Sequence, residues 1–385
     1  MEDNDRVSGG GLRFNLRELG GALGDFGPLH PLFLAYVRVI GLDAAAIMLV
    51  MGVSNVLLGA YYRLPLPIEP MKALAIYALS HRWSASLVYA TAFGTALVWL
   101  TLSLTGLIDR ILGFVPESVA RGIQLGLALY FLAESIKLMQ TSIPLALLSI
   151  GIIALLTVLR GQSAVPATIV LFGIGISIAV WEGVPVTPSI YIPRIHVFSL
   201  DEVWRGMVEA GFAQLFLTLS NAILATRLAV NERFSRKIKD GQLALNMGLM
   251  NLGAALLGCI PLCHGAGGFI AQYFYGARTG GAMIMEGLIE LTSAILFSTA
   301  VVWIFSRFPL AMVGAMLLPA SMELGRGVLK LKRRAEVAIA VLVAVTSYLT
   351  NLGVGFIVGI IAHYLVGRAF VTIDSDRGKP SGAVH

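Results

Sequence analysis

Residues 51–72 read MGVSNVLLGAYYRLPLPIEPMK, and residues 247–268 read MGLMNLGAALLGCIPLCHGAGG. A shift of 196 positions aligns five identical residues within the first sixteen positions of the two stretches. In each stretch a long apolar segment runs into a break rich in Pro or Gly, and a short apolar segment follows. The match predicts an internal repeat with one broken helix in each half. We expect Asn55 and Asn251, one of the matched pairs, to bridge helices within their own halves.

The rest of the chain has the composition of a polytopic helical membrane protein. Of its 385 residues, 57% are hydrophobic and 13% are charged, whereas about 25% are charged in an average soluble domain. This excludes disordered, collagen-like and disulfide-scaffold classes. The fold class is therefore predicted to be all-α. Its fourteen expected membrane segments are 18–39, 43–62, 68–80, 84–107, 117–137, 143–159, 164–182, 206–229, 241–259, 265–275, 282–305, 309–324, 335–350 and 352–370.

Seven segments precede the eighth, so the second half enters the membrane from the opposite side, as in an inverted repeat. With the N-terminus in the cytoplasm, 21 of the 28 Lys and Arg residues face the cytoplasm, 6 face outside, and Lys72 lies within the membrane. This bias follows the positive-inside rule, so both termini are expected in the cytoplasm. The predicted parts are a cytoplasmic tail (1–17), a first repeat (18–182), an external loop (183–205), a second repeat (206–370) and a cytoplasmic tail (371–385).

The breaks at 64–72 and 260–268 each start a short helix inside the membrane. Helix starts expose unpaired N–H groups and carry a partial positive charge. Two such starts that face each other form a site for a small anion, and Lys72 adds a full positive charge. In the alternative interpretation, Pro and Gly only kink two helices.

Ionisable residues inside membrane segments are costly and indicate function. Glu69 lies three residues before Lys72, so the two side chains share a helix face and can pair. Glu69, Asp25 and His264 are the candidate proton carriers. The alternatives are a structural pair of Glu69 with Lys72, and a helix-capping role for Asp25.

The candidate substrate-binding residues come from the two breaks and from three further polar positions. Asn221 is included because the repeat shift pairs it with Asp25, and Gln272 because it lies two turns after His264. Three other acids, Glu134, Glu286 and Glu290, are interpreted mainly as helix-packing or interface groups. The full set is Asp25, Pro67, Glu69, Pro70, Met71, Lys72, Asn221, Cys263, His264, Gly265, Ala266, Gly267, Gly268 and Gln272.

Five motifs resemble one known family. They are GDFGP at 24–28, PIEPMK at 67–72, LSNAILAT at 219–226, PLCHGAGG at 261–268 and YGARTGG at 275–281. Together they resemble the molybdate transporter family of plants, algae and prokaryotes, a distant branch of the sulfate permease superfamily. The resemblance covers roughly residues 18–330. It implies a seven-plus-seven inverted repeat, in which segments one to four and eight to eleven form a core domain carrying the site and the others form a gate domain. The family often has Gln at the position of Glu69.

The function expected on this basis is secondary active import of a tetrahedral oxyanion, molybdate first and tungstate or sulfate as alternatives, with proton coupling as a further hypothesis. An anion channel of the same fold, a nucleobase permease and an intramembrane enzyme using Cys263 and His264 are the rivals. Lys72 argues against a nucleobase, and no third orienting group follows the Cys–His pair. We expect no enzyme activity, cofactor, metal or nucleic-acid partner. The expected location is the cell membrane, with the lipid bilayer as partner and a homodimer left open.

Overall fold

The computed structural model describes residues 11–158, 166–181, 183, 191–234 and 237–377, with the side chains of residues 27, 28, 30, 31 and 366–377 left out. Both predicted tails and the predicted loop at 183–205 therefore lie partly outside the described residues.

Up to residue 181 the elements are α1 (Leu16–Ala22), η1 (Leu23–Asp25), α2 (Phe26–Ala35), η2 (Tyr36–Ile40), α3 (Ala44–Tyr62), β1 (Ile68–Pro70), α4 (Lys72–Ser80), α5 (Ala85–Leu104), α6 (Leu107–Gly113), α7 (Glu117–Met139), α8 (Ile143–Val158) and α9 (Ala167–Trp181). The elements that follow are α10 (Leu200–Gly206), η4 (Met207–Gly211), α11 (Phe212–Thr218), η5 (Leu219–Ala225), α12 (Thr226–Arg233), α13 (Asp240–Leu257), β2 (Leu262–His264), α14 (Ala266–Tyr275), α15 (Gly281–Leu296), α16 (Ser298–Arg307), α17 (Leu310–Gly325), η6 (Arg326–Lys330), α18 (Arg334–Leu349) and α19 (Leu352–Arg377).

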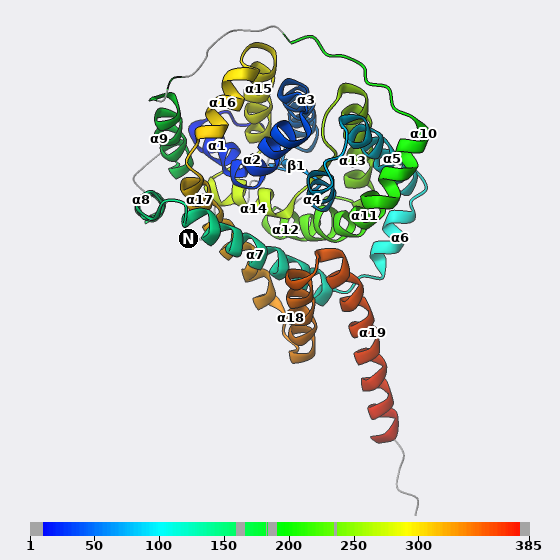
Figure 1. Cartoon of the computed structure of the whole chain (residues 1–385). Coiled ribbons are helices and arrows are strands. Elements are labelled where there is room, and N and C mark those ends of the chain that lie inside the picture. The colour runs from blue at the N-terminus through cyan, green and yellow to red at the C-terminus, as the bar shows by residue number, and fades with distance from the viewer. Residues whose placement is uncertain (1–10, 159–165, 182, 184–190, 235–236, 378–385) are drawn as a thin grey trace, which may run out of the picture.

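These elements form a helical bundle, which confirms the all-α class. Figure 1 shows β1 and α4 near the middle of the bundle, while α18 and α19 extend from one side beyond α7. By length and composition α3, α5, α7 and the continuous helix of residues 200–233 can cross a membrane, and α15 with α16 forms a fifth, bent candidate. The predicted count of fourteen segments includes much shorter pieces. The nine residues of α4, at about 1.5 Å each, reach only part of the way across a bilayer.

The two sequence breaks meet at the centre of the fold. β1 and β2 pair antiparallel, with Glu69 opposite Cys263, and each strand leads into its short helix, α4 or α14. Asn251 stays within its own half as predicted, but it joins α13 to β2 and not to another helix, because its amide bonds both backbone groups of Leu262 at 2.6 and 2.8 Å. The prediction for Asn55 is wrong, because its Nδ2 donates across the repeat to Glu290 of α15 at 2.8 Å.

Glycines from the repeat bring the long helices close together. A Cβ on Gly52 of α3 would come within 2.8 Å of the Gly287 carbonyl oxygen on α15. A Cβ on Gly248 of α13, its repeat partner, would come within 2.6 Å of Leu100 on α5. Small residues at such crossings are the usual device for packing membrane helices. The repeat therefore preserves the packing of α3 on α15 and of α5 on α13.

Two predicted boundaries differ from the structure. The helix expected to begin at 206 begins at Leu200, because Ser199 and Glu202 form a reciprocal capping box. The loop predicted to be external therefore ends at Ser199. The predicted segment 282–305 is bent by 114° between α15 and α16, where Phe297 leaves the helical conformation.

Candidate functional site

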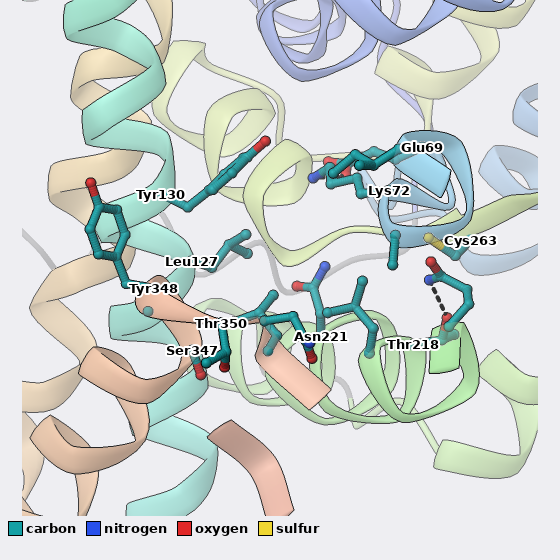
Figure 2. A pocket seen from close by; sticks show the side chains of 17 residues that line it. Glu69, Lys72, Leu127, Tyr130, Thr218, Asn221, Cys263, Ser347, Tyr348 and Thr350 are labelled. Carbon is teal, nitrogen blue, oxygen red and sulfur yellow. Dashed lines mark hydrogen bonds and ion pairs between the residues drawn. The ribbon is translucent and has the colours of Figure 1, made fainter. Parts of the chain in front are cut away.

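A cavity of about 160 Å³ lies between the first turns of the broken helices and the elements expected to form the gate. β1, α4, α11, η5 and β2 line one side, and α7 with the turn between α18 and α19 lines the other (Figure 2). Its polar or ionisable lining side chains are Glu69, Lys72, Tyr130, Gln214, Thr218, Asn221, Cys263, Ser347, Tyr348, Thr350 and Asn351.

The carboxylate of Glu69 occupies the start of α14. One oxygen accepts a hydrogen bond from the N–H of Gly268 at 2.8 Å, and the other pairs with Lys72 Nζ at 2.7 Å. Glu69 is 1% exposed. A Cβ on Gly265 would overlap this carboxylate, so the glycine makes room for it. The start of α14, which was predicted to bind a substrate anion, thus binds the carboxylate of Glu69.

Lys72 begins α4 and supplies the positive charge of the cavity. Besides its ion pair with Glu69, its ammonium group stands 4.8 Å from the centre of the Phe131 ring of α7. Such a cation–π contact is attractive while the ammonium stays charged. The Phe131 ring also packs so close to Gly267 that a Cβ there would overlap it. Lys72 therefore lies where the two broken helices contact α7, which is expected to belong to the gate domain.

The start of α4 is partly used by internal hydrogen bonds. Pro70 has no N–H, and the N–H of Met71 donates to the Pro261 carbonyl at 2.9 Å. The N–H of Leu74 donates to Gln214 Oε1 at 3.0 Å. The backbone around Pro70–Lys72 consequently offers an anion fewer free donors than the sequence suggested.

Amide and hydroxyl groups complete the cavity wall. Asn221 projects into the middle of the cavity (Figure 2), and its Oδ1 has no hydrogen-bond partner among the described residues. Gln214 donates to Thr218 at 2.9 Å. Ser347 and Thr350 lie opposite, near the end of α18 (Figure 2). Sequence reasoning missed these residues apart from Asn221. The only signals were a Gln and several hydroxyls in otherwise apolar helices.

Four of the predicted site residues line the cavity: Glu69, Lys72, Asn221 and Cys263. The others lie behind it or shape it. His264 places Nδ1 3.4 Å from the Pro67 carbonyl. Its neighbour Cys263 faces the cavity instead, which argues against a catalytic pair. The residues outside the cavity lining are Asp25, Pro67, Pro70, Met71, His264, Gly265, Ala266, Gly267, Gly268 and Gln272.

An ionic seam, made by Arg121, Glu232, Arg233, Glu323 and Lys330, links α12 with α7, α17 and η6. Buried Arg121 of α7 bonds Glu232 of α12, which also pairs with Lys330 of η6 at 2.8 Å. Next to it, Arg233 of α12 pairs with Glu323 of α17 at 2.9 Å. All of these side chains lie on the predicted cytoplasmic side. The seam therefore ties α12 to α7, α17 and η6 there.

A sequence profile described as "Molybdate transporter of MFS superfamily" matches residues 17–131 and 206–324, more than half of the chain. The chain belongs to this molybdate transporter family. The two matched blocks begin close to the starts of the two predicted repeats, and both breaks lie inside them. The resemblance seen in the five motifs is thereby confirmed.

Two plant relatives of this molybdate transporter family show the same similarity over nearly the whole chain. Molybdate transporter 2 of Arabidopsis thaliana is 26% identical over 94% of this chain and 91% of its own length. Molybdate transporter 1 of the same plant is 25% identical over 96% and 91%. An algal relative, molybdate transporter 1 of Chlamydomonas reinhardtii, is 24% identical over 89% and 90%.

Solved structures show the same fold at low identity. SLC26A9 matches with a TM-score of 0.61 and 14% identity over 91% of this chain, which spans 64% of the SLC26A9 chain. The transmembrane domain of the cyanobacterial bicarbonate transporter BicA matches with a TM-score of 0.57 and 16% identity, over 90% of this chain and 96% of that domain. This member of the molybdate transporter family is thus an integral membrane protein with a transporter fold.

Proposed function

We propose that this protein is a secondary active transporter that imports molybdate through the cavity at Lys72. The relatives' names support the substrate, and Lys72 beside a helix start is the observation that carries the site. A tetrahedral oxyanion has acceptor oxygens on all sides. The ammonium of Lys72, the amide of Asn221 and the hydroxyl of Thr218 supply donors from several directions. Tungstate and sulfate have the same shape and are the expected competitors.

Glu69 acts as a tethered competitor of the substrate in this proposal. While ionised it holds both Lys72 and the Gly268 N–H, the two groups that an incoming dianion needs. A proton on Glu69 removes its charge, weakens both contacts and frees these donors. Substrate and proton then bind together. Import of a dianion against 100 mV costs about 4.6 kcal/mol, so a cotransported cation is needed to concentrate it.

Asp25 and His264 are the further proton-carrier candidates. Asp25 is fully buried, and Gly268 separates its carboxyl from that of Glu69, because a Cβ there would meet both. His264 is also fully buried, and its Nε2 has no partner among the described residues. Neither side chain lines the cavity, which suits proton transfer better than substrate contact.

The protein is proposed to lie in the cell membrane with both termini in the cytoplasm. The repeats then span residues 18–182 and 206–370, and the longest external loop ends at Ser199. In this orientation the seam around Glu232 closes the cytoplasmic end of the cavity. Substrate enters from outside while the seam is closed, and import requires the seam to open.

The decisive experiment measures uptake of labelled molybdate by purified protein in liposomes, with unlabelled tungstate and sulfate as competitors. Two variants test whether the positive charge of Lys72 is needed to bind molybdate. Glu69→Gln keeps Lys72 and should retain binding, whereas the double variant Glu69→Gln/Lys72→Gln removes both charges together and should lose it. Saturable uptake that the double variant abolishes supports the proposal. Uptake unchanged in the double variant refutes the site, and non-saturating flux shows a channel.

A further inference from the structure

Three more acids lie behind the cavity, on the side away from the substrate. Asp25 belongs to η1, and Glu286 and Glu290 lie one turn apart on α15. Asp25 is 0% exposed, and neither of its carboxyl oxygens has a hydrogen-bond partner in the described part of the chain. A Cβ on Gly268 would meet the carboxyl groups of both Asp25 and Glu69, so these two acids lie close together across that glycine. Leu23 and Phe26, close to Asp25 in the chain, line the same cavity as Glu286 and Glu290.

Two amides hold the acids of α15. Asn55 Nδ2 donates to Glu290 at 2.8 Å, and Gln272 Nε2 donates to Glu286 at 2.7 Å. The oxygen of each amide, Asn55 Oδ1 and Gln272 Oε1, is buried and has no donor among the described residues. Together with the Asp25 oxygens, four buried acceptors in this cluster lack a donor. Buried polar atoms nearly always have a hydrogen-bond partner, so the cluster has too few hydrogen-bond donors for its acceptors.

Protons on the carboxyl groups supply the missing donors. A carboxylic acid beside a primary amide can accept from the amide N–H and donate to the amide oxygen at the same time. Glu290 with Asn55 and Glu286 with Gln272 each have one of these two bonds in place. The unused amide oxygens are the acceptors that a proton on each glutamate requires.

Glu286 and Glu290 also line a second cavity, of about 420 Å³, between α1, α2, α9, α15 and α16. Apart from these two acids and Ser293 its lining residues are apolar, and none of them lines the substrate cavity. The acids therefore border a space that is separate from the substrate cavity in its lining residues.

The cluster is surrounded by few other charged or titratable groups among the described residues. Glu18 of α1 is engaged by the backbone N–H groups of Arg278 and Thr279, at 3.1 to 3.2 Å. At the far end of α16, Arg307 stacks on Trp303 at 3.2 Å. The charged groups outside the cluster whose electrostatic influence reaches it are Glu69 of β1 and Lys72 of α4, while Glu290 in turn acts on the thiol of Cys259 before β2.

We propose that Glu286, Glu290 and Asp25 form a proton-storing site that loads from the second cavity and passes its proton to Glu69. In each transfer one carboxyl O–H bond breaks and another forms, so the donor becomes a carboxylate and the acceptor a neutral acid. The proton that reaches Glu69 releases Lys72 for the oxyanion and travels with it. The inference rests on the proposed proton-coupled import and names the residues that feed it.

The test compares the double variant Glu286→Gln/Glu290→Gln and the single variant Asp25→Asn with wild type in liposomes. A Gln side chain mimics the neutral acid and can still bond Asn55 or Gln272, so folding is preserved. Glu134→Gln, which alters an acid of α7 paired with Lys137, is the matched control. The readouts are molybdate binding at equilibrium and molybdate accumulation under an imposed pH gradient.

Each coupled proton multiplies the accumulation ratio about tenfold per unit of pH gradient. The Glu286/Glu290 and Asp25 variants should lose at least one such factor and still bind molybdate, while Glu134→Gln should behave as wild type. Full gradient-driven accumulation in both cluster variants overturns the storage site and leaves the proposed import intact. Accumulation that follows a sodium gradient and ignores pH also overturns it. Wild-type protein that neither binds nor accumulates molybdate refutes the proposed function itself.

Discussion

The substitution Gly265→Ala tests whether the Glu69 carboxylate belongs at the start of α14. Gly265 has an extended backbone, φ −135° and ψ 123°, that any residue can adopt. The substitution therefore introduces no backbone strain at residue 265. The added methyl group would overlap the Glu69 carboxyl group, which must move away. The substitution thus displaces one side chain without altering any charge.

The expected cost follows from the two contacts that Glu69 would lose. These are the bond from the Gly268 N–H at 2.8 Å and the pair with Lys72 at 2.7 Å. A hydrogen bond to a charged group contributes about 1.5–3 kcal/mol, so the two together contribute about 3–6 kcal/mol. Because Glu69 competes with the substrate for these donors, the loss should appear as a lower free energy of unfolding, by at least about 3 kcal/mol, and not as weaker molybdate binding.

The assay is labelled molybdate uptake in liposomes, with thermal unfolding of the same samples in detergent. Gly253→Ala is the control, since a Cβ on Gly253 meets nothing within 4 Å. The double variant Gly265→Ala/Glu69→Ala removes the overlapping carboxyl. It should unfold at the same temperature as Glu69→Ala alone, which isolates the coupling between the two positions. Wild-type stability in Gly265→Ala would refute the placement of Glu69.

Three further outcomes are expected. Glu69→Gln should bind molybdate but show a flatter rise of uptake as pH falls, measured between pH 5 and 8; a wild-type pH profile would leave Glu69 only a structural role. Arg121→Gln should lower the unfolding temperature, because it removes one of the cations paired with Glu232; Lys330 stays as a partner, so the cost should be below the about 3–5 kcal/mol of a fully unpaired buried charge, and Arg121→Gln/Glu232→Gln should recover part of the loss; equal stability of all three proteins argues against the seam. Lys237→Cys in a background without native cysteines should react with an impermeant thiol reagent only after the membrane is opened, and labelling of intact cells from outside would reverse the topology.

The sequence was enough to predict the centre of the fold. Pro67, Pro70 and Pro261 forbid a continuous helix, so both breaks could be placed from local backbone chemistry alone. The spacing of Glu69 and Lys72 similarly predicted that they can pair, and the ion pair is present, although Glu69 lies on β1 and not on one helix face with Lys72 as predicted. These features depend only on residues that are close together in the chain, so the sequence pattern was enough to predict them.

The rest of the site depends on contacts between distant segments. Tyr130, Ser347 and Thr350 reach the cavity only because α7 and the α18–α19 turn pack against the broken helices. Nothing in their local sequence sets them apart from other polar residues in apolar helices. The partner of Asn55 was wrongly predicted for the same reason, since Glu290 is 235 residues away. The break thus fixes where a site forms, and tertiary packing decides which distant side chains complete it.

The two repeats have similar backbones but different charged residues. In the proposed mechanism this difference separates anion binding from proton binding. The repeat shift pairs Asp25 with Asn221, and both lie in irregular turns of the first helix of their halves, η1 and η5. Asn221 faces the substrate cavity as a neutral amide, while Asp25 lies outside the cavity lining and meets the Glu69 carboxyl across Gly268. In the proposed mechanism an anion therefore meets amide and ammonium groups in the cavity, and protons meet carboxyl groups outside it. Glu69 of β1 lines the cavity and also meets the Asp25 carboxyl. In the proposed mechanism this single residue is enough to couple the two.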